Sequence, residues 1–390
     1  MNRQFERVPA RTCLLAIMIF APILAGGVEN PSMLEKFDFR DASAQQLIRY
    51  KDGVLIKSDD FRTYHVMFAK FSSEETVPVA VEGMEHLFDT GQSPNGFLFL
   101  GIKNKQMVLV EESKSGERQL LAVPKEWHPK SDEDLRPGIR AHLVPGSHRC
   151  VAIANDTIWV LDDSWKSYKL PAVPKFYKEF SPIRFGAVQS LEGDRLYAGW
   201  NEGEWGGMLA SIHLNATKLE WIHLSGKIRG DDSGILRNDS VEAMISTDDS
   251  GLWVASSSAY GLSMGLHRRK SNGEWQSLID GDFGKDWGIM KLPQPYTIND
   301  LAVDARGRVY ILAGGRGVFM IEKDRLSTIL SYDFDISSKL DDYIIGCSPD
   351  SIAVGTDGEI FISTNSFGIL AFKKTRDEWV GKQIMIKLNP

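Results

Sequence analysis

The sequence has no run of lysine and arginine longer than the three residues Arg268–Lys270, although it contains 45 of these residues against 52 aspartates and glutamates. A protein that binds nucleic acid through a general basic surface neutralises phosphates with clustered positive charge. The scattered cations and the formal net charge of −7 therefore disfavour a nucleic-acid partner.

Metal-binding patterns made of histidine and cysteine are also missing. The eight histidines never occur in pairs separated by three residues, and the three cysteines lie far apart in the chain. Structural and catalytic zinc sites normally show such short spacings. We therefore expect no zinc and no dedicated cofactor, and a divalent metal held by oxygen ligands remains as the alternative.

No long stretch shows apolar residues at helical spacing, and short paired apolar runs recur instead. The clearest examples are Ile298–Ile321, its copy Pro349–Phe372 and the looser relative Val241–Gly261. Each reads as an apolar strand, a polar turn that ends in glycine, and a second apolar strand with an aromatic residue near its centre. Glycine supplies the positive φ of such a turn, as we expect for Gly307 and Gly358.

The spacing of the aromatic residues gives the period of the repeat. Tyr197, Trp253, Tyr310 and Phe361 follow one another at intervals of 56, 57 and 51 residues, and Trp159 precedes Tyr197 by 38. Two further copies are recognisable at Gly96–Val110 and Gln46–Asp60. Repeats of this length built from strands are typical of a β-propeller. The sequence predicts an all-β protein with one propeller of about seven four-stranded blades, within a range of six to eight; a pair of β-sandwiches would not repeat the turn.

Two of the repeats resemble known propeller families. The stretch PDSIAVGTDGEIFI, which begins at Pro349, resembles an NHL-type repeat, and VEAMISTDDSGLWVAS, which begins at Val241, resembles the blades of two-component regulator propellers. The resemblance covers the last three units well and implies the propeller fold. It implies no activity, because one fold hosts many functions.

The first 27 residues have the pattern of a secretory signal peptide. Arg3, Arg7 and Arg11 precede the apolar stretch Cys13–Ala25, and small residues follow it. A membrane anchor would need about 20 apolar residues, and Pro22 interrupts this run. We expect residues 1–27 to be cleaved, residues 28–390 to form the propeller, and the mature protein to be secreted or periplasmic without stable membrane insertion. Residues Glu29–Asp41 are a candidate outer strand that closes the ring, although the last repeat also looks complete by itself.

The candidate binding residues come from loops that the repeat pattern places on one face of the propeller. Trp200, Glu202, Glu204 and Trp205 lie in one glycine-containing loop between two strands, and we place Tyr260, Trp287 and Arg316 on the same face. Aromatic side chains that are too numerous to bury together suit the wall of a ligand pocket. The simpler alternative is that both tryptophans pack against the neighbouring blade. The leading hypothesis is a module that binds a small molecule, a glycan or a protein.

The alternative hypothesis is an enzyme, either a metal-assisted lactonase-like hydrolase or a carbohydrate-active hydrolase or lyase. Its site would lie at the central channel, where Asn299, Asp300 and Asp350 open inner strands and are the weak candidates for metal ligands. Gly261–Gly265 matches the G-x-S-x-G pattern of serine hydrolases, but it lies between two strands and not on a strand-to-helix turn. Catalytic residues therefore stay unassigned.

Overall fold

The computed structural model describes residues 44–386, with gaps at 60–63, 82, 94, 129–141, 145–149, 155–156, 170–187, 193, 202–206, 215–219, 223–239, 248–250, 258–262, 283–284, 287–296, 315–316, 332–337, 341–342, 346–348, 365–367 and 377. The chain divides into two units, Met1–Asn30 and Pro31–Pro390, and all described residues belong to the second. The expected signal peptide lies outside the described residues. No helix in the described ranges is long and apolar enough to cross a membrane.

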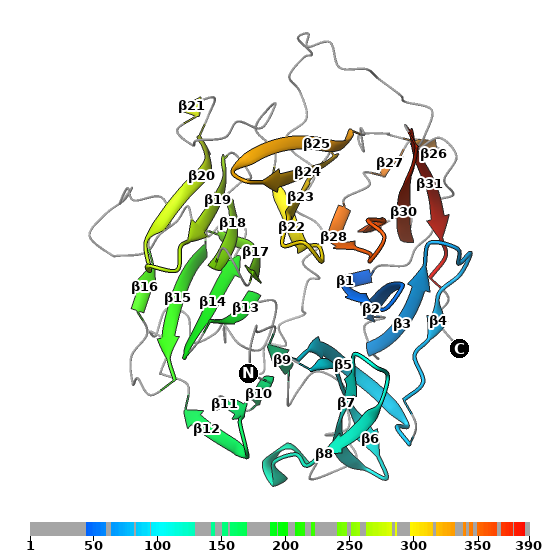
Figure 1. Cartoon of the computed structure of the whole chain (residues 1–390), viewed down its shortest axis with the longest axis vertical. Helices are drawn as coiled ribbons and strands as arrows, with labels where there is room; N and C mark the ends of the chain where they lie inside the picture. Colours follow the sequence, from blue (N-terminus) through cyan, green and yellow to red (C-terminus); the bar gives the residue numbers. More distant parts are fainter. Residues whose placement is uncertain are drawn as a thin grey trace, which may run out of the picture. The chain divides into compact units, whose positions relative to one another are not determined.

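The described strands form seven large antiparallel sheets, six of four strands and one of five, and a separate two-stranded hairpin; the large sheets follow one another along the chain (Figure 1). Blade 1 contains β1 (Ala44–Tyr50), β2 (Gly53–Asp59), β3 (Tyr64–Lys70) and β4 (Val77–Pro78). Blade 2 contains β5 (His86–Gln92), β6 (Gly96–Lys103), β7 (Gln106–Ser113) and β8 (Arg118–Leu121). Blade 3 contains β9 (His142–Val144), β10 (Cys150–Ala154), β11 (Thr157–Leu161) and β12 (Trp165–Lys169).

The remaining blades follow the same order. Blade 4 contains β13 (Val188–Glu192), β14 (Arg195–Asn201), β15 (Gly207–His213) and β16 (Glu220–Ile222). Blade 5 contains β17 (Ser240–Thr247), β18 (Gly251–Ser257), β19 (Ser263–Arg269), β20 (Trp275–Asp282) and the short β21 (Lys285–Asp286). Blade 6 contains β22 (Ile298–Val303), β23 (Val309–Ala313), β24 (Gly317–Glu322) and β25 (Arg325–Ser331). Blade 7 contains β28 (Pro349–Val354), β29 (Ile360–Thr364), β30 (Gly368–Thr375) and β31 (Glu378–Ile384), after a hairpin of β26 (Ser338–Leu340) and β27 (Tyr343–Ile345).

The seven sheets contact one another in a closed cycle. Strand β5 contacts β3 and β9, β13 contacts β9 and β17, β22 contacts β17 and β28, and β28 contacts β1. Within each sheet consecutive strands pair in chain order, starting from the strand that contacts the neighbouring blades. This arrangement is a β-propeller, and it confirms the all-β prediction of about seven blades.

The second strands and the tight turns are as the sequence predicts in five blades. Tyr197, Trp253, Tyr310 and Phe361 lie on second strands, and each is buried to 5% exposure or less. Gly307 adopts a φ of 74° and Gly358 a φ of 83° in the first turns of blades 6 and 7. An α-carbon with a side chain rarely adopts such values, so glycine is required there.

Blades 2 and 3 differ from the prediction by one strand. The stretch Gly96–Val110 forms the second and third strands of blade 2, and Trp159 lies on the third strand of blade 3 and not on the second. The innermost strands β5 and β9 were missed because their sequences are hard to recognise. Strand β9 has three residues, and β5 carries Asp89 and Gly91 within its apolar pattern.

Apart from the strands, the structure contains a 3₁₀ turn (η2, Lys125–Trp127) between blades 2 and 3. Its Trp127 is fully buried, with its ring 4.9 Å from that of Trp165 and 6.3 Å from that of Trp159. The turn thereby covers the joint between blades 2 and 3.

Blades 7 and 1 close the ring through hydrogen bonds, and each blade is built from consecutive strands. Strand β31 completes blade 7 by pairing with β30. The backbone N–H of Thr76 donates to the carbonyl of Met385 at 2.8 Å, and Met385 N–H donates to the carbonyl of Glu74 at 2.9 Å. Nearer the axis, Leu47 N–H donates to the Ser351 hydroxyl at 3.1 Å. The candidate closing strand Glu29–Asp41 lies outside the described residues.

The Ser351 hydroxyl provides a test of this closure. It accepts from blade 1 and donates at 2.6 Å to Asp300 of blade 6, so Ser351→Ala removes two buried hydrogen bonds. We expect the variant to lower the free energy of unfolding by about 1–2 kcal/mol. Chemical denaturation measures the change, with Ser327→Ala as control because Ser327 is exposed and bonds only within its own hairpin. Equal stability of the two variants would contradict a role in closure.

Candidate functional site

Five of the seven innermost strands carry a β-bulge near their first residue. The register shifts lie between Ala44 and Gln46 in β1, between Leu87 and Asp89 in β5, and at equivalent points in β17, β22 and β28. A bulge re-aims a side chain, and bulges are common at the rims of barrels and beside binding sites. The connections from second to third strands emerge at the same end of each sheet. We call this end of the propeller the loop face.

The bulged residues of blades 5, 6 and 7 are Glu242, Asn299 and Asp350. Glu242 is half-buried and accepts a short hydrogen bond from the Ser257 hydroxyl of the second strand of its own blade. Asn299 is half-buried and donates through its side-chain amide to the carbonyl of Pro349 in the next blade at 2.5 Å. Asp350 is exposed on a strand whose other five residues are buried. The loop face thus presents three oxygen-bearing side chains from neighbouring blades.

Asp300 joins blade 6 to blade 7. One of its carboxylate oxygens accepts from the Ser351 hydroxyl at 2.6 Å and from Ile352 N–H at 2.9 Å, and the other accepts from Leu301 N–H at 2.8 Å. Burial raises the pKa of Asp300 to about 6, against the opposing effect of these hydrogen bonds. The carboxylate is therefore costly to desolvate, and it is retained because it satisfies backbone and side-chain donors of the next blade.

A similar bond is made by Asp89, which sequence reasoning missed. Its carboxylate accepts from Leu143 N–H of blade 3 at 2.8 Å and forms an ion pair with Lys57 of blade 1. Lys57 also donates to Gln46 at 3.0 Å. Asp89, Asp300 and Ser351 each directly follow the bulged residue of their inner strand. Through them, polar bonds connect four successive pairs of blades: 6 with 7, 7 with 1, 1 with 2, and 2 with 3. The signal in the sequence was a single acidic residue inside an apolar inner strand.

Most of the binding residues predicted from the sequence lie outside the described residues: Glu202, Glu204, Trp205, Tyr260, Trp287 and Arg316. The backbone of Trp200 is described, and it pairs with Met208 near the end of β14. The strands on either side of the gap at 202–206 are the second and third strands of blade 4, and those beside 258–262 are the same strands of blade 5. The described ends of these strands next to both gaps lie at the loop face.

The three weak candidates for metal ligands, Asn299, Asp300 and Asp350, differ in their hydrogen bonds. Asn299 accepts from the Thr297 hydroxyl at 2.9 Å and donates to Pro349, and Asp300 uses both oxygens as acceptors. A cation at either residue would compete with these bonds for the same oxygens. Among the described residues, no group of three or more histidine, cysteine or acidic side chains is arranged to hold a metal ion. Asn299 and Asp300 therefore read as residues that join two blades.

A buried histidine lies next to the G-x-S-x-G pattern. The His267 ring makes hydrogen bonds of 3.0 Å with the hydroxyls of Ser256 and Ser277, and only 2% of the residue is exposed. Burial lowers the pKa of His267 to about 4, so the ring is neutral at pH 7. Ser263 of the pattern is the first residue of β19 and not part of a strand-to-helix turn. This arrangement stabilises three strands of blade 5 and differs from a nucleophile elbow.

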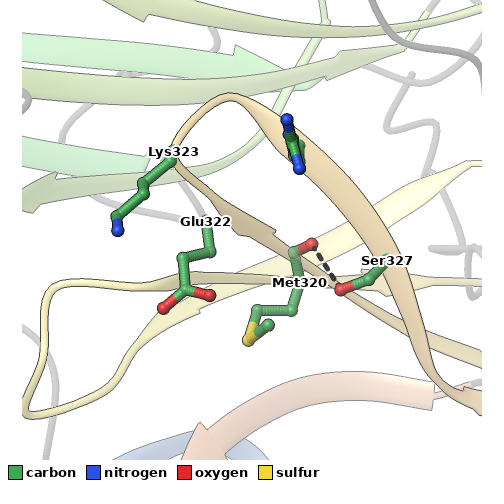
Figure 2. A pocket seen from close by; sticks show the side chains of 5 residues that line it. Met320, Glu322, Lys323 and Ser327 are labelled. Atoms are coloured by element: carbon green, nitrogen blue, oxygen red, sulfur yellow. Dashed lines mark hydrogen bonds between the residues drawn. The ribbon is translucent and has the colours of Figure 1, made fainter.

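A hollow of about 520 Å³ lies on the β24–β25 hairpin of blade 6. It is lined by Met320, Glu322, Lys323, Arg325 and Ser327. Figure 2 shows Met320 and Glu322 projecting from the same side of β24, with the Ser327 hydroxyl bonded at 3.3 Å to the Met320 carbonyl. The hairpin turn is at the end of the sheet opposite the loop face, and one hairpin supplies all five residues. The hollow is thus separate from the bulged inner strands.

No protein-family model matches the sequence, and no curated protein matches it. A solved structure of a catalytically inactive virginiamycin B lyase from Staphylococcus aureus with quinupristin is 13% identical, with a TM-score of 0.44 over 86% of this chain and 99% of that chain. The extracellular domain of a putative hybrid two component system from B. thetaiotaomicron is 12% identical, with a TM-score of 0.46 over 86% of this chain and 39% of that chain. An oligogalacturonate lyase from Vibrio parahaemolyticus is 9% identical, with a TM-score of 0.45 over 86% of this chain and 91% of that chain. These are distant matches of fold, and scores below 0.5 carry no argument about function.

Proposed function

We propose that this protein is an exported binding module whose ligand sits on the loop face. The observation that carries the proposal is the set of bulges at the start of the inner strands, which lie at the same end as the connections between second and third strands. Several blades therefore contribute side chains to one surface. Multi-element surfaces of this kind are the usual ligand sites of rigid scaffolds.

The aromatic residues predicted for this face supply the contact area. In the sequence, Trp200, which lies near the end of β14, and Trp205 flank Glu202 and Glu204. A tryptophan ring stacks on sugar rings and on cations, and carboxylates accept hydrogen bonds from hydroxyl and ammonium groups. The ligand class that fits this set is a glycan or another small molecule rich in hydrogen-bond donors.

Alanine substitution in this connection tests the proposal. We expect Trp205→Ala to weaken binding of a glycan found in an array screen by about ten-fold or more, as expected for an aromatic anchor. Isothermal titration of the mature protein measures the affinity. Trp379→Ala serves as the matched control, because Trp379 packs in the core between blades 6 and 7. If no glycan or small ligand binds, or if both variants bind like the wild type, the proposal fails.

An enzyme at the same end of the propeller is the second candidate, and Asp350 is the observation that favours it. An exposed carboxyl with a pKa raised to about 6 by desolvation suits proton transfer near neutral pH. A hydrolase or lyase would lose turnover in Asp350→Asn, whereas a binding module turns over nothing. Incubating the protein with the ligands that bind, followed by mass spectrometry, separates the two candidates.

A further inference from the structure

The bulged position of blade 7 differs from its counterparts in blades 5 and 6. Glu242 bonds to Ser257 and Asn299 bonds to Pro349, so both side chains serve the fold. Asp350 forms no hydrogen bond or ion pair with any of the residues that the structure describes. Of these three bulges, only the one in blade 7 therefore presents a carboxylate that has no partner among the described residues.

Asp350 is exposed, yet buried neighbours shield part of its carboxyl from solvent. Its neighbours Pro349 and Ser351 are buried, and the surrounding protein raises the pKa of Asp350 to about 6 by desolvation alone. No bond within the described fold offsets that desolvation. A carboxyl that is held at a bulge between buried neighbours and has no partner among the described residues is a candidate for binding.

Two residues of blade 6 fix the backbone on both sides of Asp350. Asn299 donates to the carbonyl of Pro349 at 2.5 Å, and Asp300 accepts from Ser351 and Ile352. The bulge thus cannot shift along the ladder without breaking bonds to the neighbouring blade. Supporting contacts of this kind hold functional groups in position before the ligand arrives.

We propose that Asp350 contacts the ligand of the loop face and receives an ammonium group of that ligand, with Asn299 and Asp300 as positioning residues. The inference rests on the proposed function, since it names the ligand chemistry of the same face. An ionised carboxylate only accepts hydrogen bonds, and a cation relieves its desolvation cost more than a neutral hydroxyl does. Glu242, half-buried at the equivalent place in blade 5, adds negative charge on the same face and disfavours an anionic ligand.

The test compares two oligosaccharides that differ in charge. A glucosamine tetramer carries an ammonium on each ring, and an N-acetylglucosamine tetramer has the same rings without the charge. We expect the wild-type protein to bind the charged tetramer more tightly in isothermal titration at neutral pH. Asp350→Asn, which keeps the shape and removes the charge, should weaken that binding by about ten-fold or more and leave the neutral tetramer unaffected.

The outcomes separate this inference from the proposed function. If the charged tetramer does not bind, or if Asp350→Asn binds it like the wild type, the inference is overturned. The loop-face proposal survives either result as long as some ligand loses affinity in Trp205→Ala. Circular dichroism and thermal unfolding check that Asp350→Asn is folded, and relief of the desolvation cost predicts a variant at least as stable as the wild type.

A test of Asn299 as a positioning residue must distinguish a local effect on Asp350 from a general loss of structure. We expect Asn299→Ala to weaken binding of the glucosamine tetramer several-fold and to shift the pH at which the Asp350 carboxyl titrates by NMR. Asp300 in blade 6 and Glu242 in blade 5 are the acidic groups on the preceding inner strands, and neither contributes to the raised pKa of Asp350, which desolvation alone causes. A variant that binds normally, or that loses affinity while Asp350 titrates as in the wild type, would contradict positioning.

Discussion

Acidification from pH 6.5 to pH 4 is expected to remove about 3 kcal/mol of stability through the single residue His267. In the unfolded chain this imidazole takes up a proton near pH 6.5, whereas burial lowers its pKa to about 4 in the folded protein. The unfolded state therefore binds more protons in this range. The stabilisation is complete above pH 6.5 and is lost as the pH falls through 4.

Asp300 acts in the opposite direction over nearly the same range. Burial raises the pKa of Asp300 to about 6 from an unfolded value of 3.8, so the stability it contributes is complete below 3.8 and is lost as the pH rises through 6. The two contributions partly cancel in the wild type. For that reason the experiment compares His267→Gln and Asp300→Asn with the wild type by urea denaturation at each pH.

The expected differences have opposite signs. Relative to the wild type, His267→Gln should become more stable as the pH falls, and Asp300→Asn should become less stable. The glutamine introduced by the first substitution would keep a hydrogen-bonding side chain between the two serines without a titrating proton. Variants whose stability changes with pH in parallel with the wild type would show that neither group carries the shift.

Gly199→Ala is expected to lower the free energy of unfolding by about 3 kcal/mol, at the upper end of the usual cost of overpacking. Gly199 lies on β14, and a Cβ atom there would stand 2.5 Å from the Cβ of Val241 on the inner strand of blade 5. Because the Cβ atom of Val241 is attached directly to the backbone, the clash can be relieved only if β17 moves. The crowding at Gly199 therefore comes from the adjacent blade.

The matched control is another glycine that faces a neighbouring blade. A Cβ atom at Gly91 would lie 3.2 Å from that of Leu143, a contact that a shift of a few tenths of an ångström relieves. Gly91→Ala should cost less than about 1 kcal/mol. Thermal and chemical denaturation measure both variants, and similar losses for the two would mean that the close approach of blades 4 and 5 is not what limits residue 199.

The candidate site was only partly accessible from the sequence. Asn299, Asp300 and Asp350 stood out because polar residues open otherwise apolar strands, and the structure shows why the three are not equivalent. Asn299 and Asp300 bond to blade 7, and only Asp350 remains free of described partners. Asp89 escaped notice because its strand has no clear repeat pattern, yet it ties blade 2 to blade 3 as Asp300 ties blade 6 to blade 7.

The sequence by itself determined the class of fold and the hairpins of most blades. A run of apolar residues, a glycine with positive φ in the turn and a buried aromatic residue in the second strand are local requirements, and blades 5, 6 and 7 carry all three in their own residues. Only the tertiary structure decided the pairing between blades. Which residue after a bulge accepts a hydrogen bond from the next blade depends on the packing of strands about 50 residues apart, as Asp300 and Ile352 show. Long-range packing also decided that Asn299 and Asp300 bond to blade 7, whereas Asp350 has no partner among the described residues.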